Sequence, residues 1–114
     1  MTEIKVSDNQ KRAAAVCASA INVGCLPLPM KGGVYGFGPC NFSISEDGVS
    51  EVEYKVLASQ IDKVEKTISE EKVKAYFDVA SKDAGFSEKS RAILAMAQDY
   101  YKNVIKERVG SQRN

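Results

Sequence analysis

Apolar residues recur every three or four positions over residues 9–24, a spacing that predicts an amphipathic helix. Ser7 or Asp8 can cap the start of this helix, and Gly24 stands where a residue in the left-handed conformation commonly ends one. The apolar positions carry mostly small side chains: Ala13, Val16, Cys17, Ala20 and Ile21. Small side chains let other elements come close, so we expect this face to lie against the core.

Residues 41–56 fit two hydrophobic patterns, which predict different structures. At a period of two, one face of a β-hairpin with its turn at residues 46–48 carries Phe42, Ile44, Val52, Tyr54 and Val56. At a period of about 3.5, a helix starting after Ser45 or Ser50 carries a seam of Tyr54, Leu57, Ile61, Val64 and Ile68. Only the helical pattern continues beyond Leu57, so both alternatives stay open for residues 41–56 and a helix is predicted after them.

Two further helices are predicted in the C-terminal part of the chain. Ser69 can cap the first, and Gly85 closes it. Its apolar positions are Val73, Tyr76, Phe77 and Ala80. Ser87 opens a longer helix with a broad apolar stripe that ends near Gly110, and we expect residues 110–114 to be a disordered tail.

The segment over residues 24–42 is unusual because it combines all three prolines and five of the eight glycines with large apolar side chains. A solvated linker is built from glycine, serine and charged residues instead. The apolar side chains of this Gly/Pro segment must therefore be sheltered, either by the protein's own helices or by a partner. We predict a loop that covers a hydrophobic surface.

Together these patterns predict a single domain over residues 1–114 that is mainly α, with three to four helices, a Gly/Pro-rich covering loop and, if the first pattern holds, a short β-hairpin near residues 41–56. The predicted core contains Val16, Ile21, Leu57, Ile61, Val64, Phe77, Ile93, Leu94 and Ala97.

Charge and cysteine content narrow the class of protein. Sixteen basic residues against fifteen acidic ones leave a formal net charge of +1, which does not drive nucleic-acid binding. The longest uncharged tract, residues 13–30, is broken by Pro27 and Pro29, so no membrane segment is predicted. The N-terminus lacks the layout of a secretion signal, and three cysteines fit reduced thiols better than a disulfide framework. We therefore expect a cytoplasmic protein.

Candidate chemistry is sparse, because the chain contains no histidine, the commonest general base and metal ligand. Cys17, Cys25 and Cys40 lack the paired spacing of zinc or redox motifs. We therefore predict no enzymatic activity, no metal and no cofactor. Cys25 and Cys40 bracket most of the Gly/Pro segment, so a disulfide or a shared cluster there is an alternative.

Two motifs suggest other functions. The glycines over residues 32–38 are similar to a phosphate-binding loop, although the Gly-Lys-Ser/Thr ending is missing, and they suggest a nucleotide or small-molecule site. Residues 79–91 are similar to the middle of a helix-turn-helix, with Lys89 and Arg91 near the start of the second helix as candidate DNA contacts. An ordinary helical hairpin explains the same residues.

The function that the sequence favours is recognition of another protein, as an adaptor, an inhibitor or a self-assembling module, rather than binding to nucleic acid or membrane. Apolar and aromatic residues that exceed what a few helices can bury are the candidate contacts: Met30, Tyr35, Phe37, Tyr100 and Tyr101. A homo-oligomer formed through the second or the last helix is one form of this prediction.

Overall fold

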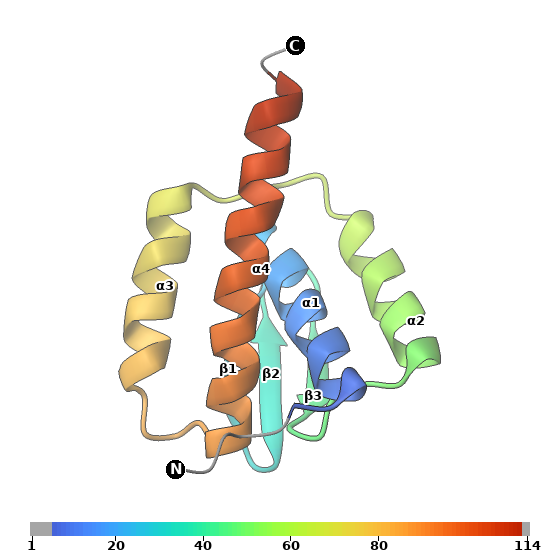
Figure 1. Ribbon diagram of the computed structural model, residues 1–114, viewed down its shortest axis with the longest axis vertical. Helices are drawn as coiled ribbons and strands as arrows, with labels where there is room; N and C mark the ends of the chain where they lie inside the picture. Colours follow the sequence, from blue (N-terminus) through green and yellow to red (C-terminus); the bar gives the residue numbers. More distant parts are fainter. Residues whose placement is uncertain (1–5, 113–114) are drawn as a thin grey trace.

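The computed structural model describes the backbone of residues 6–112 and the side chains of residues 6–103. Its elements, in chain order, are α1 (Asp8–Asn22), β1 (Leu26–Met30), β2 (Gly33–Phe37), β3 (Phe42–Ser45), α2 (Glu51–Asp62), α3 (Glu70–Lys82) and α4 (Glu88–Gln112). The mainly α prediction is confirmed in this coarse form. A three-stranded antiparallel sheet in the order β1-β2-β3 accompanies the helices, so the fold is not an all-α bundle (Figure 1).

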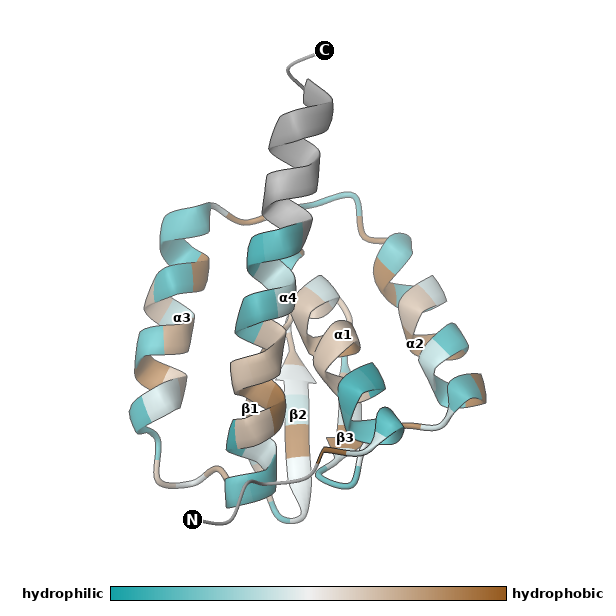
Figure 2. Ribbon diagram, viewed as in Figure 1, coloured by the Kyte–Doolittle hydropathy of each residue, from teal (hydrophilic) through white to brown (hydrophobic). Residues whose placement is uncertain are grey.

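Helix α1 lies at the centre of the molecule and packs against α4, α2 and β1. Figure 1 shows the sheet behind α1 and α4. The start of α1 is hydrophilic and most of the rest is apolar (Figure 2), and its buried apolar side chains begin at Ala13. The fully or nearly fully buried apolar side chains of α1 are Ala13, Ala14, Val16, Cys17, Ala18, Ala20 and Ile21.

Both ends of α1 form as the sequence predicts. At the start, Ser7 and Gln10 make a capping box, in which each side chain accepts a hydrogen bond from the other residue's backbone N–H. At the end, Gly24 has a φ of 91° and donates to Ile21, while Cys25 donates to Ala20. This pair of hydrogen bonds is a Schellman motif, and it turns the chain directly into β1.

The Gly/Pro segment forms β1 and β2, a β-hairpin rather than the predicted loop. Leu28 pairs with Tyr35 and Pro27 with Gly36 across the two strands. Proline has no N–H to donate, so it is tolerated only where the missing donor faces away from the neighbouring strand. The edge position of β1 meets this requirement, because Pro27 turns its carbonyl outward to accept a hydrogen bond from the Tyr76 hydroxyl.

The hairpin alternative for residues 41–56 is wrong. Residues 42–45 do form a strand, but β3 pairs with β2 rather than with residues 52–56. The latter belong to α2, which Ser50 and Glu53 cap with a second capping box. Helix α2 ends at Asp62, so the seam predicted to run through Ile68 stops early.

The predicted core is largely confirmed. Seven of its members are buried: Val16, Ile21, Ile61, Phe77, Ile93, Leu94 and Ala97. Leu57 and Val64 are half-buried and pack against this core from α2 and from the connection to α3. Helix α4 continues to Gln112, and residues 113–114 of the predicted disordered tail lie outside the described residues.

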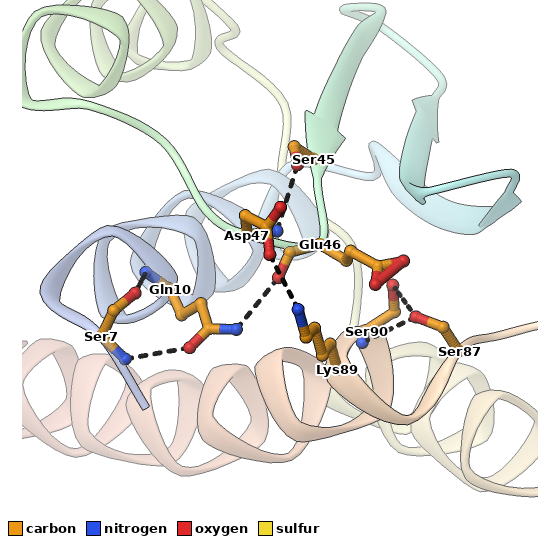
Figure 3. Close-up of polar contacts among 8 residues, drawn as sticks. All are labelled: Ser7, Gln10, Ser45, Glu46, Asp47, Ser87, Lys89 and Ser90. Carbon is orange, nitrogen blue, oxygen red and sulfur yellow. Dashed lines mark hydrogen bonds and ion pairs between the residues drawn. The ribbon is translucent and has the colours of Figure 1, made fainter. Parts of the chain in front are cut away.

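The turn after β3 ties the sheet to the start of two helices (Figure 3). The Gln10 side-chain amide donates to the Glu46 carbonyl at 3.1 Å, and Lys89 of α4 forms an ion pair with Asp47 at 3.0 Å. Gly48 lies directly on the backbone of Asn9 at a φ of 102°, and a Cβ atom there would overlap the Asn9 carbonyl group. The turn can therefore reach α1 only with glycine at this position.

We predict that Gly48→Ala lowers the free energy of unfolding by about 3 kcal/mol, because it combines an unfavourable φ with a backbone overlap. Gly32→Ala is the matched control: its φ of 77° is also positive, but nothing lies within 4 Å of the added methyl group. The control should lose only about 1 kcal/mol. Urea denaturation of both variants measures the difference, and equal losses would show that the contact between the turn and α1 is unimportant.

Candidate functional site

The two faces of the sheet differ in what covers them. Paired residues on antiparallel strands point to the same side, and neighbours along a strand point to opposite sides. The side that faces the helices is buried at Pro27, Val34, Gly36, Phe42 and Ile44 and half-buried at Pro29. The opposite side carries Leu26, Leu28, Met30, Tyr35 and Phe37, and we call these five residues the outer sheet face.

The outer sheet face is apolar and open to solvent. Phe37 is 63% exposed, Leu28 47% and Met30 37%, while Leu26 and Tyr35 are half-buried. None of the five carries a charge, and the neighbouring positions on β3 are the exposed serines Ser43 and Ser45. Apolar side chains clustered in this way are typical of a surface that another molecule covers.

Glycines place the strands so that this face forms. A Cβ atom on Gly36 would overlap the ring of Phe42, and one on Gly33 would overlap the carbonyl oxygen of Ile44. The Phe42 ring can therefore pack directly against Gly36 on the inner side of β2 while Tyr35 and Phe37 point the other way. These glycines serve close packing inside the sheet, which leaves the predicted phosphate-binding loop without support from the geometry.

The outer edge of β1 is closed to a further strand. Pro27 and Pro29 offer no N–H group there, and the Pro27 carbonyl is already taken by the Tyr76 hydroxyl. Burial, together with the nearby Cys17 and Asp83, raises the pKa of Tyr76, so this hydroxyl keeps the proton that it donates. A partner of the hairpin therefore has access to its outer face rather than to this edge.

Three of the five predicted contact residues come together in the structure. Met30, Tyr35 and Phe37 share the outer sheet face, whereas Tyr100 is half-buried and Tyr101 is buried on α4, away from that face. Sequence reasoning missed Leu26 and Leu28. Their alternation with Met30 is a strand signal, but the prolines between them obscured it.

Both candidate DNA-contacting residues, Lys89 and Arg91, interact with other residues of the protein. Lys89 pairs with Asp47, and the hydrogen bond and charge of that carboxylate raise the pKa of Lys89. Arg91 donates to the carbonyl of Asp83 in the turn before α4. Helices α3 and α4 lie side by side with opposite chain directions and a short connection between them (Figure 1), as in an ordinary helical hairpin. This arrangement lends the DNA-binding alternative no support.

A groove of about 620 Å³ lies between α3 and α4. Its floor is formed by Val73, Phe77 and Tyr101, and the rings of Phe77 and Tyr101 already pack on each other with centroids 6.4 Å apart. Charged residues of both signs line its rim: Glu70, Lys74, Asp99 and Lys102. The three side chains of this floor are at most 6% exposed, whereas Leu28, Met30 and Phe37 of the outer sheet face are 37–63% exposed.

Within residues 6–103, no three cysteine or acidic side chains are grouped as a metal ion would require. None of the described helices combines the length and the apolar character needed to cross a membrane. Comparisons of the chain with protein-family models, with curated proteins and with solved structures found no match.

We predict effects of very different size for two phenylalanines on opposite sides of the sheet. Phe42→Ala removes a buried ring and should lower the free energy of unfolding by about 3 kcal/mol. Phe37→Ala removes an exposed ring and should change it by less than about 0.5 kcal/mol. Chemical denaturation measures both. A large loss at Phe37 would mean that its ring belongs to the core.

Proposed function

We propose that this protein acts by recognising another protein through the outer sheet face. The observation that carries the proposal is the exposure of Phe37, Leu28 and Met30 on one continuous, uncharged surface of a rigidly held sheet. Aromatic and large apolar side chains supply most of the binding energy in protein interfaces. Tyr35 adds a hydroxyl group, which can give such an interface a directional hydrogen bond.

A flat sheet face suits a protein partner better than a small molecule, because small ligands need a concave site that surrounds them. The strands already order the backbone beneath these side chains, so binding has to order only the side chains themselves. We include three further points in the proposal: the protein is not an enzyme, it works in the cytoplasm, and the partner is either a second copy of this chain or a different protein.

We predict that Phe37→Ala weakens the interaction at least tenfold while the protein stays folded. Val52→Ala is the control, because Val52 is 74% exposed but lies on α2. Sedimentation equilibrium at high micromolar concentration first tests whether the partner is a second copy. If the wild-type protein is monomeric, affinity capture followed by quantitative mass spectrometry compares the wild type with the two variants.

The proposal requires that Phe37→Ala weakens either the self-association or the capture of a specific protein at least tenfold, and that Val52→Ala preserves it. If the wild-type protein is a strict monomer and all three forms capture the same proteins in the same amounts, the outer sheet face is not a recognition surface.

A further inference from the structure

Two of the three cysteines meet at one end of the sheet. Cys25 lies between α1 and β1, and Cys40 lies in the connection between β2 and β3. Their Sγ atoms are 2.7 Å apart, and the backbone N–H of Cys40 donates to the Cys25 Sγ at 3.2 Å. Both cysteines are free thiols, as is Cys17.

The backbone holds this pair in place from both sides. The Schellman motif at the end of α1 fixes Cys25, whose N–H donates to the Ala20 carbonyl at 2.9 Å. In the connection between β2 and β3, Gly38 has a φ of 149°. It lies so close to Gly24 and Cys25 that a Cβ atom would overlap the Gly24 carbonyl oxygen. The contact between the two thiols therefore follows from two special backbone positions.

We propose that Cys25 and Cys40 form a dithiol site that a small-molecule disulfide, such as oxidised glutathione, converts into an intramolecular disulfide bond. Cys40 is half-buried and Cys25 is buried, so the reagent reaches Cys40 first. The Cys40 thiolate attacks one sulfur of the reagent and releases one small thiolate. The Cys25 thiolate then attacks the Cys40 sulfur of this mixed disulfide and releases the second.

The exchange balances without any other reactant. Two protein thiols and one small disulfide become one protein disulfide and two small thiols, and the protons of the two cysteines pass to the released thiolates. Burial, the hydrogen bond with Cys25 and the charge of its sulfur raise the pKa of Cys40 to about 12. Because the thiolate is the attacking form, the exchange should speed up as the pH rises through the neutral range.

Cys17 provides an internal comparison. It is completely buried on α1, and burial raises its pKa to about 12, as it does for Cys40, so access is what separates the two thiols: a reagent reaches Cys40 and not Cys17. The new bond would close a loop that contains all of β1 and β2, with the cysteines 15 positions apart. It would thereby fix the strand connection that follows Phe37, the most exposed ring of the outer sheet face.

The experiment incubates the folded, full-length protein with excess oxidised glutathione at several pH values, then blocks free thiols and maps the peptides by mass spectrometry. We expect one product, a peptide pair joined through Cys25 and Cys40, which forms faster at higher pH. The melting temperature should rise by roughly 10 °C, as expected for closing a loop of this length. Dithiothreitol should reverse both changes.

Two variants make the result specific. Cys17→Ala should form the same disulfide with the same increase in melting temperature. Cys40→Ser should form no intramolecular disulfide and show no increase. The proposal is overturned if the folded wild-type protein keeps three free thiols after prolonged oxidation, if it stops at a glutathione adduct, or if Cys17 or a second chain supplies one of the linked sulfurs.

Discussion

Close packing on the small-residue surface of α1 is the constraint on which the rest of the structure depends. Alanines such as Ala13, Ala14 and Ala20 let α4 and the sheet approach the helix from different sides, and each is completely buried. Residues with longer side chains at these positions would separate the elements and open cavities between them. The sheet therefore meets α1 with one face, and its other face is left to solvent or to a partner.

The position of the sheet against α1 is fixed at both ends. At one end Gly48 lies on the first turn of α1, and Gln10 holds the turn after β3 by a hydrogen bond. At the other end Gly38 lies on Gly24 and Cys25, directly after α1. Between these anchors the strands have little freedom to shift, which explains how a short sheet can present an apolar face without rearranging to bury it.

Elements that depend on local residues could be predicted from the sequence. The helix caps at Ser7, Ser50 and Ser69 and the left-handed end at Gly24 are local signals, and most of the predicted core followed from helical periodicity. The hairpin could not be predicted, because prolines normally argue against a strand. Only the three-dimensional position of β1 at the sheet edge, with Tyr76 bonding to Pro27, makes them compatible with one. The sequence pattern likewise does not decide whether residues 42–45 pair with β2 or with residues 52–56. That pairing depends on the tertiary structure.

The residues of the candidate site also divide into those that the sequence could predict and those that it could not. Composition alone pointed to Met30, Tyr35 and Phe37, because exposed apolar residues near glycine and proline need shelter. Their common face, and the addition of Leu28, followed only from the register of the hairpin.

The most direct test of this account is amide hydrogen exchange by NMR combined with a paramagnetic solvent probe. We predict that the amides of Val34 and Tyr35 exchange as slowly as those of α1 while the Phe37 ring is fully accessible to the probe. Fast, unprotected exchange throughout residues 26–37 would contradict the account.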